Sequence, residues 1–133
     1  MTSKLVRSFV DDVYGFRYYV SLHQTTRGFS NWMVKRFKNP LPGEIIELLD
    51  SDSLGGVTIF MEGSTIVFWF PVDLQPGIVA HEAVHAMTHV FTQRHVSLSE
   101  REAAPYYVQF IVDKIYNASR FHVRPFELLW AGV

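Results

Sequence analysis

The sequence predicts an α+β domain in which a small, mostly antiparallel sheet is followed by two helices. Two patterns support this fold class: apolar residues alternate or form short runs before Pro71, and they recur every three or four residues after it. The chain has 133 residues, of which 48% are hydrophobic and 19% are charged. Such a composition is typical of a well-packed globular protein, so we expect residues 1–133 to form a single domain.

The composition argues against several kinds of partner and site. The net charge is -1 and the basic residues form no long run, so we expect no nucleic-acid partner. The absence of cysteine excludes disulfides and thiolate metal ligands. No apolar run approaches the roughly 18 residues of a membrane span, and the first residues lack the pattern of a signal peptide. We therefore expect a cytoplasmic protein with no membrane partner.

The first element that the pattern predicts is a half-buried strand over residues 13–23, because apolar and polar side chains alternate along it. A short helix is expected over residues 30–39, capped by Ser30 and ending before Pro40. The segment 43–50 is too short to assign. The apolar face of the strand would hold Tyr14, Phe16, Tyr18, Val20 and Leu22, and the opposite face Arg17, Ser21 and His23.

A β-hairpin is predicted next. The runs "GVTIFM" and "TIVFWFP" are rich in β-branched and aromatic residues, and Glu62-Gly63-Ser64 separates them with a glycine-containing turn. Both strands are apolar on both faces. We therefore expect other elements to pack against each side of this hairpin.

Two helices are predicted after the hairpin. In the first, Ala80, Val84, Met87 and Phe91 recur at helical spacing and indicate the face toward the core, while His81, His85 and His89 form a second stripe. The second helix is expected over residues 100–118. Its apolar ridge would consist of Tyr107, Ile111 and Ile115.

The first of these helices contains the sequence His81-Glu82-Ala83-Val84-His85, an HExxH motif. Histidines four residues apart lie one helical turn apart, so both can bind one zinc ion at about 2.0 to 2.1 Å. Glu82 is then placed to act as general base toward a zinc-bound water. A third ligand must come from elsewhere. The alternative is that both histidines are surface residues of an ordinary amphipathic helix.

His89 is not expected to join this site. It lies eight residues after His81, which is about 12 Å along a straight helix. The metzincin pattern is also absent, because it needs glycine and histidine where this chain has Thr88 and Phe91. We expect His89 to be a hydrogen-bonded or solvent-facing histidine.

The stretch "VAHEAVHAMTHVFTQRHVSLSEREAAPYYVQFIV" resembles small gluzincin-type zinc metallopeptidases of bacteria and phages, including minimal zincins and the ImmA/IrrE group. The resemblance covers about residues 55–116. It implies a minimal zincin-like domain with an HExxH helix and a following helix that carries the third ligand. Glu102 matches that glutamate, although Pro105 stands where the pattern prefers alanine. The resemblance thus implies zinc held by His81, His85 and Glu102, in a bacterial or phage-infected cytoplasm.

Two points about the second helix stay open. Glu100 competes with Glu102 as ligand, and Glu102 has an alternative role in a capping box with Ser99. A helix that begins near residue 101 or 102 would place Pro105 in its first turn and weaken that capping box. Tyr106, one turn after Glu102, is the candidate for stabilising an oxyanion.

The function that these residues favour is zinc-dependent hydrolysis of a protein or peptide. The substrate is expected to lie along a sheet edge, near the strand of Trp69. Two alternatives remain: a catalytically idle zincin-fold protein with an interaction or structural role, and a non-peptidase zinc amidohydrolase. The oligomeric state is not readable from the sequence.

Overall fold

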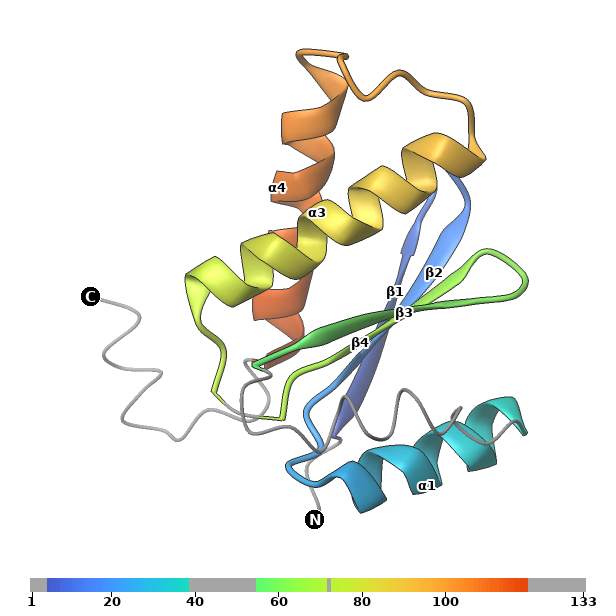
Figure 1. The fold of residues 1–133 in the computed structure, drawn as a ribbon, viewed down its shortest axis with the longest axis vertical. Helices are drawn as coiled ribbons and strands as arrows, with labels where there is room; N and C mark the ends of the chain where they lie inside the picture. Colours follow the sequence, from blue (N-terminus) through green and yellow to red (C-terminus); the bar gives the residue numbers. More distant parts are fainter. Residues whose placement is uncertain (1–4, 39–54, 72, 120–133) are drawn as a thin grey trace.

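The computed structural model describes residues 5–38, 55–71 and 73–119, and the segment 43–50 lies outside these ranges. The described residues form an α+β fold with a four-stranded mixed sheet and three helices (Figure 1). The fold class is therefore confirmed at this level. The elements are β1 (Val6–Asp11), β2 (Phe16–Ser21), α1 (Thr26–Phe37), β3 (Val57–Met61), β4 (Thr65–Trp69), α3 (Pro76–Gln93) and α4 (Ala103–Ser119).

The strand order in the sheet is β1-β2-β4-β3. The pairs β1–β2 and β3–β4 are antiparallel hairpins, and β2 pairs with β4 in parallel. Within the sheet that the structure describes, β1 and β3 are the edge strands. The predicted hairpin is confirmed, with Gly63 (φ 73°) and Ser64 (φ 55°) in its turn.

The strand predicted over residues 13–23 is shorter than expected. β2 begins at Phe16, and the residues before it form the turn of a hairpin whose first strand, β1, was not anticipated. The carboxylate of Asp11 explains the turn, because Oδ1 accepts hydrogen bonds from the amides of Val13 (2.8 Å) and Tyr14 (3.2 Å). An aspartate that captures nearby amides in this way favours a turn over a continued strand.

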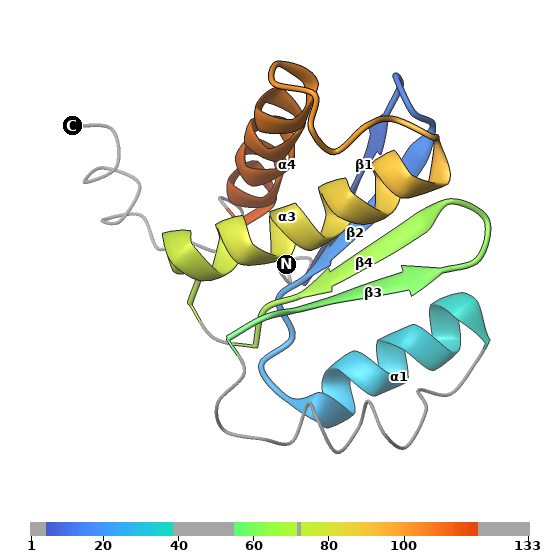
Figure 2. The same ribbon diagram turned by 45° about the horizontal axis from the view of Figure 1, so that its top comes forward.

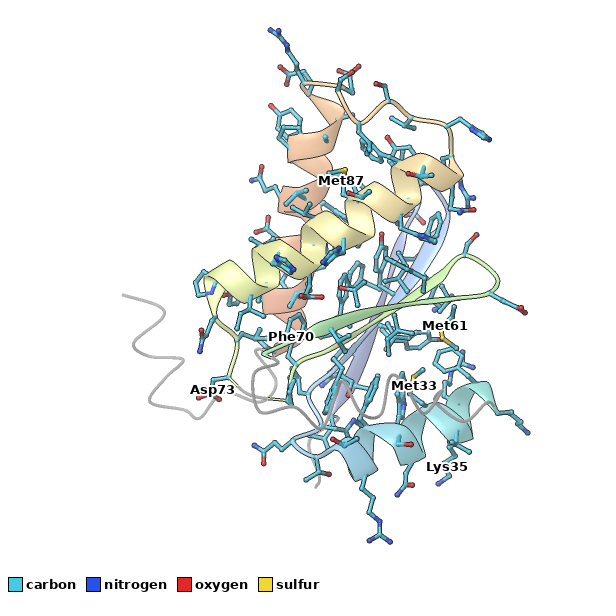
Figure 3. All side chains as sticks on the ribbon, in the orientation of Figure 1. Met33, Lys35, Met61, Phe70, Asp73 and Met87 are labelled. Carbon is cyan, nitrogen blue, oxygen red and sulfur yellow. The ribbon has the colours of Figure 1, made fainter. Side chains whose placement is uncertain are left out.

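The sheet is covered on both faces, as the apolar hairpin predicted. Figure 2 shows α1 on one side of the sheet and α3 with α4 on the other. In Figure 3, Met33 of α1 and Met61 of β3 lie on the same side of the sheet, and Met87 of α3 lies on the other. The alternation predicted for β2 is consequently wrong in one respect, because its Tyr19 and Ser21 are buried as well. The core on the α1 side consists of Tyr19, Phe29, Met33, Ile59, Val67 and Trp69.

Helix α1 begins earlier than predicted. Its cap is Thr25, whose hydroxyl accepts a hydrogen bond from the Gly28 amide at 3.0 Å, and Ser30 lies inside the helix. The helix ends at Phe37, before Pro40 as expected. The cap prediction failed because two residues of similar capping preference stand five positions apart.

The two later helices were predicted with different success. In α4 the ridge of Tyr107, Ile111 and Ile115 is buried as expected, and the helix begins at Ala103, which puts Pro105 in its first turn. In α3 the predicted core stripe is confirmed for Phe91, which is buried, and for Met87, which packs against the core, but it is wrong for Val84, which is 46% exposed. The buried residues of α3 are Val79, Glu82, Ala83, Ala86, Val90 and Phe91.

No helix within the described residues is both long and apolar enough to cross a membrane.

Candidate metal centre

The start of β3 lies close to the first turn of α3. A Cβ atom added to Gly55 would lie 2.2 Å from Ile78 Cδ1, and one added to Gly56 would lie 2.8 Å from the Phe70 ring. The two glycines therefore allow an approach that a side chain would obstruct. The approach brings Thr58, the second residue of β3, against the HExxH turn of α3.

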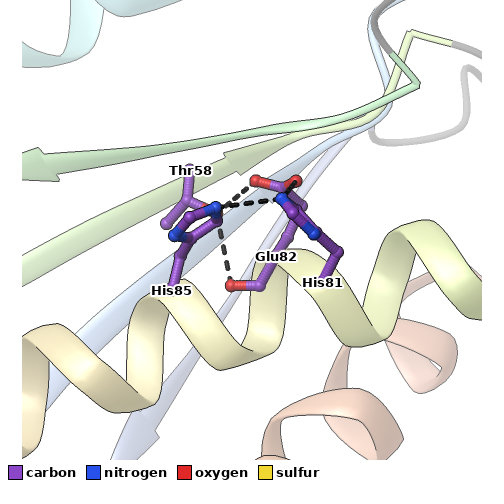
Figure 4. A network of polar contacts seen from close by, with 4 residues as sticks. All are labelled: Thr58, His81, Glu82 and His85. Carbon is purple, nitrogen blue, oxygen red and sulfur yellow. Dashed lines mark hydrogen bonds and ion pairs between the residues drawn. The ribbon is translucent and has the colours of Figure 1, made fainter.

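The HExxH side chains form one cluster on α3 (Figure 4). The Nε2 atoms of His81 and His85 are 3.0 Å apart, and Oε2 of Glu82 is 4.0 Å from Nε2 of His81. One potential ligand atom from each of the three residues lies within 4.8 Å of the others. Within the described residues, these side chains form a group of histidine and acidic residues close enough together that it could hold a metal ion.

One side of the cluster is buried and the other is open. Glu82 is 7% exposed, and its carboxylate turns toward the sheet, where the Thr58 hydroxyl donates to Oε1 at 2.7 Å. The side chain of His81 is 68% exposed, and His85 is exposed as well. The imidazoles are thus accessible to solvent, whereas the Glu82 carboxylate, which is turned toward β3, is hydrogen-bonded to Thr58.

The separation of the two imidazole nitrogens limits what can lie between them. Two neutral rings whose Nε2 lone pairs face each other repel, so at 3.0 Å either one ring donates a proton to the other or both bind a cation. Ligands of one tetrahedral zinc ion, at bond lengths of about 2.0 to 2.1 Å, lie about 3.3 Å apart. The observed separation is close to that value. The chemistry of the donor set therefore fits zinc.

Glu102 is not part of this cluster. It directly precedes α4, which begins beyond the C-terminal end of α3, whereas the two histidines of the motif lie in the first ten residues of α3 (Figure 1). The assignment of Glu102 as third ligand remains a prediction. The capping box with Ser99 is not formed, because the Ser99 amide donates to Ser97 Oγ at 3.2 Å.

Tyr106 is 65% exposed and contacts a different part of the molecule. It lines a pocket of about 480 Å³ together with Asp12 and Lys114, beside the β1–β2 turn. His81 and His85 do not line this pocket. The assignment of Tyr106 to an oxyanion thus remains a prediction that rests on its position after Glu102.

His89 lies outside the cluster, as its distance along the helix predicted. Its ring stacks on Phe60 of β3, with ring centroids 3.9 Å apart and planes 9° from parallel. Burial lowers the pKa of His89, which favours the neutral ring. It therefore serves as a partly buried aromatic contact between α3 and β3.

The strand of Trp69, along which the sequence places the substrate, is not an edge of the described sheet. Trp69 lies in β4, a central strand, and is 1% exposed with its ring stacked on Phe29. The edge strand beside the cluster is β3. Sequence reasoning also missed Thr58, for which the strand pattern offers no signal, because its role depends on a helix 24 residues later in the chain.

No protein-family model, curated protein or solved structure matches this chain. The likeness to gluzincins therefore rests on the motif and its sequence context. The cluster of His81, Glu82 and His85 is consistent with a metal site, and it does not by itself assign the chain to a zincin family.

Proposed function

We propose that this protein is a zinc-dependent peptidase whose metal is held by His81 and His85. The observation that carries the proposal is the 3.0 Å separation of their Nε2 atoms, with a Glu82 carboxylate oxygen 4.0 Å from one of them. Bound zinc would supply a Lewis acid and lower the pKa of a water ligand toward neutrality. The remaining chemistry belongs to the side chains of this chain.

Glu82 serves as general base in this proposal and not as a metal ligand. Its Oε2 atom is 4.0 Å from His81 Nε2, longer than the roughly 3.3 Å that separates neighbouring ligands of a tetrahedral zinc ion. The Glu82 carboxylate therefore lies farther from His81 than a second ligand of the same zinc ion would. From there it can accept a proton from a bound water and deliver it to the leaving amine.

A peptide is the substrate class that the surroundings favour. β3 is an edge strand of the described sheet and lies beside the cluster through the contact of Thr58 with Glu82. An edge strand presents unpaired amide and carbonyl groups, with which an extended peptide can form main-chain hydrogen bonds. We therefore place the substrate along β3, instead of along the strand of Trp69.

Glu102 as third ligand and Tyr106 as oxyanion donor enter this proposal through the sequence resemblance alone. The cytoplasmic setting, bacterial or phage-associated, and the absence of a nucleic-acid partner likewise remain expectations from the sequence. None of these statements is needed for the roles of His81, Glu82 and His85.

The proposal is tested by metal analysis combined with hydrolysis. We expect about one zinc per chain after purification in zinc-containing buffer, and loss of that zinc in His81→Ala and in His85→Ala. A mixture of fluorogenic peptides should be hydrolysed by the zinc-loaded protein, and Glu82→Gln should retain zinc but not hydrolyse. Zinc content equal in the parent and both histidine variants would refute the metal site.

A second candidate is a zinc-binding protein that hydrolyses nothing. It is favoured by one observation: within the described residues the cluster contains two histidines and one carboxylate, and Glu102 is not with them. In that case zinc would bind as above, no peptide would be cleaved, and Glu82→Gln would leave any biological effect unchanged. A biological effect that is lost in Glu82→Gln with zinc still bound would favour the peptidase.

A further inference from the structure

Thr58 makes a contact with the candidate base that the HExxH motif does not provide. Its hydroxyl lies 2.7 Å from Glu82 Oε1 and 3.3 Å from the Glu82 carbonyl oxygen. A threonine hydroxyl has a single proton to donate. The shorter bond to the carboxylate is the stronger of the two, because an ionised acceptor strengthens a hydrogen bond.

We infer that Thr58 is a positioning residue that holds the Glu82 carboxylate in its working orientation, an inference that rests on the proposed function. The hydroxyl occupies Oε1, so Oε2 is the carboxylate oxygen left to face His81 at 4.0 Å. Without this bond the glutamate side chain is free to rotate about its terminal torsions, which have broad preferences. With the bond in place, Oε1 accepts the Thr58 hydroxyl and Oε2 remains on the side of His81.

The surroundings make this contact a fixed one. Thr58 is a residue of β3, where it lies opposite Phe68 in the ladder with β4, so its backbone is held by the sheet. Glu82 is 7% exposed, and water therefore competes little for its carboxylate. Figure 4 shows Thr58, Glu82 and the two histidines in one network, with Thr58 on the strand and the other three on the helix.

The chain also offers matched variants for a test. Thr58→Val keeps the β-branched shape and removes the hydroxyl, whereas Thr58→Ser keeps the hydroxyl and removes a methyl group. Thr65→Val is the control, because Thr65 lies on the neighbouring strand and its hydroxyl donates to the Gly63 carbonyl instead of to Glu82. A purely structural effect of losing a strand threonine would appear in this control as well.

The first measurement is peptide hydrolysis by the zinc-loaded proteins. We expect Thr58→Val to lower kcat/KM about 10- to 100-fold, the usual effect of removing a group that orients a metal-site residue. Zinc affinity should stay within about threefold of the parent, since the hydrogen bonds of the Thr58 hydroxyl go to Glu82, which is not a metal ligand in the proposal. Thr58→Ser and Thr65→Val should hydrolyse at close to the parent rate. Parent-like hydrolysis by Thr58→Val would overturn the inference.

A second measurement does not depend on hydrolysis. In the metal-free protein, NMR scalar couplings of the Glu82 side chain should indicate one rotamer in the parent and in Thr58→Ser, but rotamer averaging in Thr58→Val. If the parent hydrolyses no peptide, the proposed function fails and these couplings still decide the role of Thr58. Couplings that are unchanged in Thr58→Val would show that the hydroxyl does not orient the carboxylate, and the inference would be wrong.

The double variant Thr58→Val/Glu82→Ala separates positioning from any independent effect. If Thr58 acts only through the Glu82 carboxylate, the visible spectrum of the cobalt(II)-loaded double variant should match that of Glu82→Ala alone, because alanine has no side-chain oxygen to accept the Thr58 hydrogen bond. A further spectral shift in the double variant would assign Thr58 an effect of its own and overturn the inference as stated.

Discussion

Replacing Tyr107 by phenylalanine should destabilise the fold strongly, because its hydroxyl is the middle member of a buried hydrogen-bond chain. The Tyr107 hydroxyl donates to Asp11 Oδ2 at 2.7 Å, and the Tyr18 hydroxyl is its other partner. Since the one proton of Tyr107 goes to Asp11, Tyr18 is the donor in the second bond. Burial is the main cause that raises the pKa of both phenols, so both remain protonated.

The magnitude follows from what Tyr107→Phe leaves behind. Asp11 is 2% exposed and loses a hydrogen bond to its carboxylate, which costs about 1.5 to 3 kcal/mol. Tyr18 is 0% exposed and loses its acceptor, which costs about 1 kcal/mol more. Oδ1 of Asp11 keeps its two backbone donors, so the turn itself is retained. We expect the free energy of unfolding to fall by about 3 kcal/mol, and Tm by about 12 °C for a domain of this size.

The assay is urea unfolding followed by circular dichroism, with Tyr106→Phe as the matched control. Tyr106 is the adjacent residue and is 65% exposed, so its hydroxyl should contribute less than about 0.5 kcal/mol. Tyr18→Phe should fall between the two, because Tyr107 still donates to Asp11 in that variant. If Tyr107→Phe and Tyr106→Phe have the same urea midpoint, the hydrogen-bond chain of Asp11, Tyr107 and Tyr18 does not stabilise the packing of β1 and β2 on α4, and the reasoning is refuted.

Four further outcomes are expected. His89→Ala should retain the zinc content of the parent, because His89 stacks on Phe60 and lies outside the metal cluster; zinc loss in a folded variant would count against this. Burial lowers the pKa of His89, so the stability that its neutral ring contributes is present above about pH 6.5 and is lost as the pH falls below that value. The free energy of unfolding should therefore decrease more steeply with falling pH in the parent than in His89→Phe, and equal slopes would contradict this expectation. Under a weak chelator, Glu102→Ala should lose zinc faster than Glu100→Ala if the sequence resemblance holds, and the reverse ranking would move the ligand to Glu100. Gly63→Ala should cost about 1 kcal/mol in urea unfolding because Gly63 has φ 73°, and an unchanged midpoint would argue against strain at this turn.

The elements that the sequence predicted well are those specified by local patterns. The β3–β4 hairpin follows from a glycine-containing turn between two apolar runs, and the ridge of α4 follows from helical spacing around Tyr107. The HExxH spacing likewise brings His81 and His85 together, because one helical turn separates them. These features need no knowledge of what packs against them.

The features that the sequence did not predict depend on contacts between distant segments. β1 was missed because its sequence VRSFVD shows no clear apolar alternation and its one buried residue is the polar Asp11, which forms the turn by accepting hydrogen bonds from backbone amides. Thr58 and Glu82 are 24 residues apart, and nothing in either local pattern indicates that they meet. Glu102 lies outside the His81, Glu82 and His85 cluster, and its distance from the histidines likewise depends on how α4 packs and not on the motif.

The wrong assignment of Val84 to the core face of α3 has a physical cause that bears on function. Hydrophobicity alone turns Val84 inward and Glu82 outward, and the molecule does the reverse: Val84 is 46% exposed, while Glu82 is 7% exposed. Burying a carboxylate and exposing valine is unfavourable unless the carboxylate finds a partner, which here is the Thr58 hydroxyl at 2.7 Å. Departures from the best local pattern are expected where a site must present particular groups. The orientation of α3 that buries Glu82 also leaves both imidazoles on the open side, so that the carboxylate is held against β3 while the histidines face solvent.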